Sequence, residues 1–174
     1  MIVTGLVFDL PQGRWMDEVT RLRSRHDPVR LRFPIEITVV GSSGLGWFSE
    51  GQTDLMRRVG EVARACSPFS FRFDGVKCFP ESSAYYLSPA DDIGFHDFQR
   101  RLANCGLRFE PSPYEYVPHC TIAILAADAA AEAHAEVRAF PVPSDNIRVS
   151  SVSFWSVDQS HQVAQQGQRI ALGA

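Results

Sequence analysis

Apolar and polar residues alternate along several short segments of the chain, and in a few longer segments the apolar residues recur at helical spacing. Alternation with a period of two places successive side chains on opposite faces of a strand, whereas a spacing of three to four places them on one side of a helix. Strands are therefore predicted at residues 2–10, 35–41, 69–79, 83–88, 116–125, 147–157 and 168–172. Helices are predicted at residues 14–25, 53–66, 91–106 and 128–140.

Strands and helices are interleaved along the sequence, and short turns separate many of them. Short turns between alternating strands favour antiparallel pairing, because parallel strands need long crossover connections. No flexible linker or low-complexity tract divides the chain. We therefore predict an α+β fold in which residues 1–174 form one domain.

The composition is that of an ordinary globular protein, with 45% hydrophobic and 21% charged residues. The net charge of −3 provides no broad attraction for duplex DNA or for an anionic membrane. The four cysteines lie in apolar contexts without metal-binding spacing, so we expect reduced thiols. The sequence also has no secretory leader and no membrane-length apolar segment. These features predict a soluble, cytoplasmic protein, which we expect to be a monomer.

The segment at residues 116–125 places a histidine and a threonine inside an apolar strand. His119 and Thr121 are two positions apart, so they share one face of that strand, roughly 7 Å from each other. For an isolated pair, a buried histidine that bonds a nearby carbonyl is the simpler explanation. A counterpart in the first half of the chain changes this interpretation, because Glu36 and Thr38 are also two positions apart and follow a proline.

With these two pairs, the chain resembles the 2H phosphoesterase superfamily, which includes 2'-5' RNA ligase-like proteins and cyclic phosphodiesterases. The segments that carry the resemblance are LVFDLP at 6–11, PFSFRFDGVKCFPESSAYYLS at 68–88 and YEYVPHCTIAIL at 114–125. The resemblance implies a bilobal fold of two similar α+β lobes, each an antiparallel sheet with helices outside, that meet at a central cleft. Each lobe of such proteins contributes one His-x-Thr or His-x-Ser strand to the cleft.

The resemblance also implies roles for the paired residues. His119 and Thr121 match the second motif of the family, and Thr38 matches the hydroxyl of the first. Glu36 stands where the family has its first histidine. In such enzymes one histidine removes a proton, the other donates one, and the two hydroxyls hold the phosphate without a metal ion or cofactor. The implied catalytic pair is His119 as general acid and Glu36 as an altered base, with Thr38 and Thr121 as substrate-binding residues.

A glutamate at position 36 carries an electrostatic cost. A carboxylate about 4 Å from a phosphodiester is repelled by roughly 4 kcal/mol at an effective dielectric of 20. Either nearby cations compensate this repulsion or the pKa of the glutamate rises. Arg30 and Arg32 share the sequence parity of Glu36, but Pro34 interrupts the strand, so the pattern does not place them in the cleft.

Three functions remain open at this point. The first is a phosphodiesterase that acts on a 2',3'-cyclic phosphate or a 2'-5' linkage of a nucleotide or small RNA. The second is a protein that binds nucleotide or RNA ends through Thr38, His119 and Thr121 without turnover. The third is a different reaction, or a substrate that carries a cation beside its phosphate.

Aromatic residues are expected along the edges of the cleft, where stacking on a base is worth roughly 1–3 kcal/mol. Tyr116, three positions before His119, and Phe79 are the candidates for substrate binding. Core packing is an equal alternative for each of the two rings.

Overall fold

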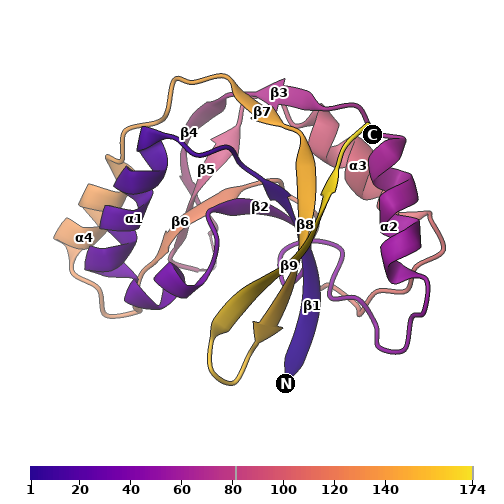
Figure 1. Ribbon diagram of the computed structural model, residues 1–174. Coiled ribbons are helices and arrows are strands. Elements are labelled where there is room, and N and C mark those ends of the chain that lie inside the picture. Colours follow the sequence, from indigo (N-terminus) through magenta and orange to yellow (C-terminus); the bar gives the residue numbers. More distant parts are fainter. Residues whose placement is uncertain (81, 174) are drawn as a thin grey trace.

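The computed structural model describes residues 1–80 and 82–173, and within these the chain forms two larger antiparallel sheets and a small two-stranded one (Figure 1). The first sheet has the strand order β2-β1-β8-β9, so it combines the two ends of the described chain. Its strands are β1 (Ile2–Asp9), β2 (Glu36–Val40), β8 (Ser151–Asp158) and β9 (Val163–Ala171).

The second sheet comes from the middle of the chain and has the order β4-β5-β6. Its strands are β4 (Phe73–Cys78), β5 (Ala84–Pro89) and β6 (Cys120–Ile124). Two short strands, β3 (Phe69–Phe71) and β7 (Ile147–Val149), pair with each other at the top of Figure 1. The predicted α+β fold with two lobes of antiparallel strands is therefore confirmed.

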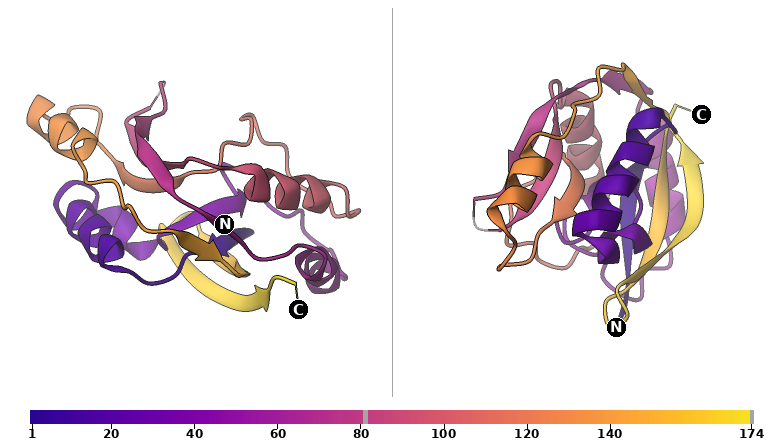
Figure 2. Two further views of the ribbon diagram at one scale, coloured as in Figure 1. Left: turned by 90° about the horizontal axis from the view of Figure 1, so that it is seen from above. Right: turned by 90° about the vertical axis from the view of Figure 1, so that its left-hand side faces the viewer.

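The helices lie outside the sheets in two groups, which stand at opposite ends of the molecule in the left view of Figure 2. One group contains α1 (Arg14–His26) with the short 3-10 helix η1 (Pro28–Arg32), and α4 (Ala131–Arg138). The other group contains α2 (Leu55–Arg64) and α3 (Ile93–Ala103). All four α-helices lie within the ranges that the apolar spacing predicts, apart from the last residue of α1.

Each sheet is covered by a helix that follows a strand of the other sheet. Helix α1 follows β1 but contacts β6, and its Trp15 ring meets Phe73 of β4 edge to face at 5.6 Å. Helix α3 follows β5, yet its Phe95 and Phe98 rings meet Phe8 of β1, each with centroids 5.1 Å apart. The apolar core is therefore shared between the two halves of the chain.

Two segments predicted as single strands are each divided between two sheets. Residues 69–79 form β3 and β4, separated at Arg72, and residues 147–157 form β7 and β8, separated at Ser150. The carbonyls of Arg72 and Ser150 accept hydrogen bonds from the amides of Ala90 (2.8 Å) and Leu172 (2.9 Å), which directly follow β5 and β9. Alternation continues through Arg72, so the hydrophobic pattern does not reveal the first change of sheet. At the second break, Ser150 and Ser151 shift the apolar positions from 147 and 149 to 152 and 154, and the single predicted strand runs across this irregularity.

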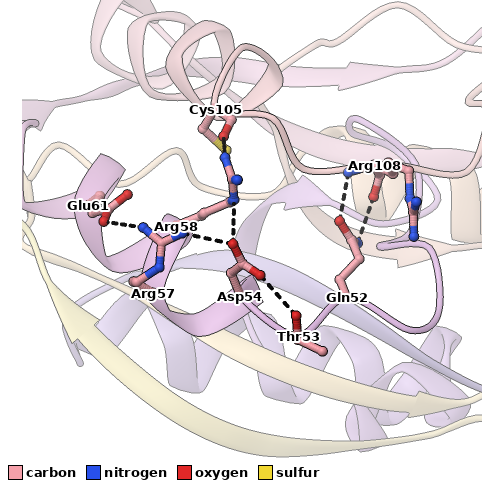
Figure 3. A network of polar contacts seen from close by, with 8 residues as sticks. All are labelled: Gln52, Thr53, Asp54, Arg57, Arg58, Glu61, Cys105 and Arg108. Carbon is pink, nitrogen blue, oxygen red and sulfur yellow. Dashed lines mark hydrogen bonds and ion pairs between the residues drawn. The ribbon is translucent and has the colours of Figure 1, made fainter.

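Polar contacts fix the long connection that follows β2 against the segment after α3 (Figure 3). The Gln52 side chain donates to the Arg108 carbonyl (2.9 Å) and accepts from the Arg108 amide (2.8 Å). Arg58 of α2 donates to the carboxylate of Asp54 (3.2 Å) and to the carbonyl of Cys105. These contacts tie the start of α2 to the end of α3.

A buried arginine joins α1 to both halves of the molecule. Arg23 is only 3% exposed, and its Nη1 donates to the carbonyls of Arg30, Phe33 and Pro34 at 3.1–3.2 Å. Its Nη2 donates to the carbonyl of Thr121 in β6 at 2.6 Å. One guanidinium therefore holds the segment that leads into β2 against the strand that follows His119.

None of the helices formed by residues 1–80 and 82–173 combines the length and the apolar character that a membrane crossing requires.

The contacts of Arg23 predict a large loss of stability when its charge is removed. Arg23→Met leaves buried carbonyls without their charged donor, and we expect the free energy of unfolding to fall by about 3 kcal/mol, measured by urea denaturation. Arg21→Met, on the exposed side of the same helix, is the control and should change it by less than about 0.5 kcal/mol. Equal losses in the two variants would contradict a clamping role for Arg23.

Candidate active site

The two paired motifs lie on neighbouring strands at the junction of the lobes. Strands β2 and β6 contact each other, although they belong to different sheets. In β2, Glu36 lies opposite Asp9 of β1 and Thr38 lies opposite Val7. In β6, Thr121 lies opposite Tyr86 of β5. His119 lies directly before the first residue of β6, one position outside the hydrogen-bonded strand.

His119 is held firmly by its surroundings and is only 8% exposed. Its Nδ1 lies 2.6 Å from the carbonyl oxygen of Val117, which can only accept, so Nδ1 carries the proton. The rings of Phe79 and Tyr86 meet the imidazole edge to face, with centroids 4.9 and 5.1 Å away. Burial lowers the pKa of His119 below its ordinary value, and the charge of Arg30 acts in the same direction.

Glu36 has one satisfied and one unsatisfied carboxyl oxygen. The hydroxyl of Thr38 donates to Oε1 at 3.0 Å. Oε2 is shielded from solvent and has no hydrogen-bond partner among the described residues. Burial raises the pKa of Glu36 to about 7, against the smaller lowering effects of the Thr38 hydrogen bond and the charges of Arg23 and Arg30. The glutamate is therefore close to half protonated at neutral pH.

Arg30 is the cation that the sequence pattern does not place. Its charge lowers the pKa values of both Glu36 and His119, so it lies within electrostatic reach of the two groups. Its guanidinium lies 5.1 Å from the centre of the Phe33 ring and 3.8 Å from a carboxylate oxygen of Asp27. Arg32 is directed elsewhere and donates to the carbonyl of His161 at 3.3 Å.

The two aromatic candidates occupy different positions. Phe79 stacks on Tyr86, with centroids 4.4 Å apart, and packs against His119, so it supports the imidazole. The ring of Tyr116 packs against the imidazole of His96, with ring centroids 5.3 Å apart. The Tyr116 hydroxyl is buried and has no hydrogen-bond partner in the described part of the chain. Burial raises the pKa of Tyr116 far above its ordinary value, and the charge of Glu36 adds to this shift. Tyr116 therefore lies within electrostatic reach of Glu36.

Arg23 also belongs to this region, although the motif comparison does not select it. A signal for Arg23 is present in the sequence, because it lies four positions after Val19 on the apolar side of α1. An arginine in such a position needs buried acceptors, and the carbonyls described above provide them.

The arrangement provides a carboxyl group with a pKa of about 7 and an imidazole with a pKa below its ordinary value, at adjacent strands, with a cation within electrostatic reach of both. Such a pair can remove a proton from one oxygen and deliver a proton to another. Within residues 1–80 and 82–173, no group of three His, Cys, Asp or Glu side chains is placed to hold a metal ion.

Comparisons with known proteins agree with this architecture. A sequence model of the 2'-5' RNA ligase superfamily matches residues 10–161. No curated protein matches the chain by sequence. The solved structure of E. coli LigT complexed with NADP+ is 17% identical and has a TM-score of 0.63. The structure of E. coli LigT complexed with 3'-AMP is 16% identical with a TM-score of 0.59, and TT0787 of Thermus thermophilus is 17% identical with a TM-score of 0.65. Each alignment covers 99% of this chain and 98% of the other, so the shared fold extends over the whole length.

The raised pKa of Glu36 predicts that the protein loses stability as pH rises. Between the ordinary pKa of 4.5 and the folded value of about 7, the unfolded chain releases this proton first, so the free energy of unfolding falls with increasing pH. The shift of the Glu36 pKa from 4.5 to about 7 corresponds to a change of about 3 kcal/mol in the free energy of unfolding. We therefore expect Glu36→Gln to become more stable relative to wild type, by up to about 3 kcal/mol, between pH values of about 5 and 8.5.

Denaturant unfolding at several pH values measures this difference. Glu50→Gln, at an exposed glutamate, is the control and should follow the wild-type profile. If the free energies of unfolding of wild type and Glu36→Gln differ by the same amount at every pH between about 5 and 8.5, the folded protein does not hold the proton on Glu36.

Proposed function

This chain belongs to the 2'-5' RNA ligase superfamily, and on that premise we propose that it is a phosphodiesterase for a 2',3'-cyclic phosphate or a 2'-5' linkage of a nucleotide or small RNA. The observation that carries this proposal is the pair of proton-transfer groups, Glu36 and His119, on the adjacent strands β2 and β6. The complexes of E. coli LigT with 3'-AMP, ATP and NADP+ support a nucleotide as the ligand. We take the site residues and the single bilobal domain of residues 1–174 as parts of the same proposal.

The protonation states support an exchange of the two catalytic roles that the family resemblance implies. His119 holds its proton on Nδ1, so the lone pair of a neutral imidazole is at Nε2, where it can accept a proton. Ionisation of Glu36 costs free energy, because its Oε2 is shielded from solvent and accepts no hydrogen bond from the described residues. We therefore propose His119 as the general base and protonated Glu36 as the general acid.

The directions of the two pKa shifts agree with this assignment. Burial raises the pKa of Glu36 to about 7, which favours its protonated form, and lowers the pKa of His119 below its ordinary value, which favours the neutral imidazole. A protonated Glu36 also removes the repulsion between a carboxylate and the phosphate.

In hydrolysis of a cyclic phosphate, Nε2 of His119 would take a proton from water as its oxygen forms a bond to phosphorus. The bond from phosphorus to one ribose oxygen breaks, and that oxygen takes the proton of Glu36. Transfer of the proton from the imidazolium to the new carboxylate through solvent restores both groups. The hydroxyls of Thr38 and Thr121 would hold the non-bridging phosphate oxygens, and Arg30 would offset their charge. No step of this sequence requires a metal ion.

Turnover of nucleoside 2',3'-cyclic phosphates and of 2'-5' and 3'-5' linked dinucleotides, measured with EDTA present, tests the proposed activity. Wild type should cleave at least one of them, and His119→Ala should be slower by about 100-fold to 10,000-fold. An activity that EDTA abolishes, or that His119→Ala retains, would contradict the proposal. If the panel binds without turnover, the protein is a binder of nucleotide or RNA ends, as the second interpretation of the sequence holds.

A substrate with a good leaving group distinguishes the two assignments of acid and base, because both give the same bell-shaped dependence on pH. The nitrophenolate released from a nucleotide 4-nitrophenyl ester needs no proton. With Glu36 as the acid, Glu36→Gln should cleave this ester at close to the wild-type rate and lose about 100-fold or more on the natural linkage. His119→Gln should lose activity on both substrates. The opposite result, with His119→Gln retaining activity on the ester, would return the acid role to His119.

A further inference from the structure

A cavity borders Glu36 on the face of the first sheet. Its volume is about 410 Å³, within the range of small-molecule sites, and its walls come from β1, α1, η1, β2, β8 and β9. Glu36 and Arg23 line it, whereas His119, Thr38 and Thr121 do not. The cavity therefore borders Glu36 without including the other three motif residues.

Unpartnered polar groups gather at this cavity. In the described part of the chain, four buried side-chain atoms have no hydrogen-bond partner, and three of them are Arg23 Nε, Glu36 Oε2 and Trp155 Nε1. All three residues line the cavity. Because an unpaired buried polar group costs free energy, a ligand that provides partners when these side chains adjust would recover that cost. Two of the groups are N–H donors and the third is a carboxyl oxygen.

The charges around the cavity disfavour a phosphate and favour an uncharged ligand. Asp9, Asp17 and Glu36 contribute carboxyl groups to the lining; Asp9 forms an ion pair with Arg169 at 3.1 Å, and Glu36 is the protonated acid of the proposed function. The Nη1 and Nη2 atoms of Arg23, the cationic residue of the lining, already donate to backbone carbonyls. The remaining walls combine apolar side chains with two amides, in Leu10, Met16, Leu31, Phe33, Gln12 and Gln166. Such walls suit a flat ring with hydroxyl groups.

We propose that this cavity binds the nucleoside part of the substrate, the part whose ribose oxygen receives the proton from Glu36. The indole of Trp155 and the apolar side chains would contact the base, and Glu36 would reach the ribose oxygen. The identity of the ligand rests on the proposed function, but the position of the site rests on the cavity and its unpartnered groups.

Binding of free nucleosides tests this site without relying on turnover. Adenosine, guanosine, cytidine and uridine are titrated separately by ligand-observed NMR, with inorganic phosphate as a comparison probe. Thr20→Phe would fill the cavity from its α1 wall. Ser24→Phe is a matched control, because Ser24 is also exposed on α1, bonds the carbonyl four positions earlier as Thr20 does, and is not part of the lining.

At least one nucleoside should bind wild type and Ser24→Phe with dissociation constants that agree within twofold. The same nucleoside should bind Thr20→Phe at least tenfold more weakly. The affinity for inorganic phosphate should be the same in all three proteins. Trp155→Phe keeps an aromatic ring without the N–H, and should lower the affinity for the same nucleoside at least threefold. This variant decides the question if Thr20→Phe does not fold. Failure of every nucleoside to bind folded wild type, or equal binding to wild type and the folded cavity variants, would overturn the proposal.

Turnover separates this inference from the proposed activity. If nucleosides bind in the cavity but no phosphodiester is cleaved, the site stands and the proposed activity fails. If phosphodiesters are cleaved while folded Thr20→Phe retains the wild-type KM and nucleoside affinity, the activity stands and the cavity is not the nucleoside site.

Discussion

A buried cation, the guanidinium of Arg23, holds together the segments that carry the two motifs. It donates to carbonyls of the chain leading into β2 and to the carbonyl of Thr121 in β6, so the separation of Glu36 and His119 depends on one side chain. Backbone carbonyls, rather than a carboxylate, provide its hydrogen-bond acceptors. Among the described residues no carboxylate forms a direct ion pair with Arg23, and its positive charge lowers the pKa of Glu36. The same residue thereby fixes the geometry of the site and contributes to its electrostatics.

The electrostatics explain how a glutamate is compatible with a phosphodiester. Burial makes the ionised form of Glu36 expensive, and the nearby charges of Arg23 and Arg30 only partly reverse this effect. The group is therefore largely neutral below neutral pH and presents a proton rather than a negative charge. The pKa of His119, which is buried and bonded to the carbonyl of Val117, lies below its ordinary value, mainly because burial disfavours the imidazolium. A glutamate and a histidine can in this way share the work of two histidines, with their protons distributed in a fixed order.

The sequence predicts the fold class, the helices and the strands that carry the motifs, because each of them has a clear hydrophobic period. It does not predict the break at Arg72, because alternation continues there while the strand changes its sheet. The single strand predicted at residues 147–157 overlooks the change of alternation at Ser150 and Ser151. The pairing of Glu36 with Thr38 follows from their spacing in one strand. The position of Arg30 does not, because η1 and Pro34 separate it from β2 and only the folded chain determines where its charge lies. The cavity beside Glu36 is similarly invisible in the sequence, since six elements form its walls.

The exchange of helices between the sheets limits how the molecule can move. Helix α1 is continuous with the first sheet and packs on the second, and α3 is continuous with the second sheet and packs on the first. The contacts of Trp15 with Phe73 and of Phe8 with Phe95 keep each helix on the sheet that it covers, so the chain crosses between the lobes in the short connections at residues 10–13 and 90–92. Any opening of the lobes would therefore have to be accommodated in these two tethers and in the contact between β2 and β6.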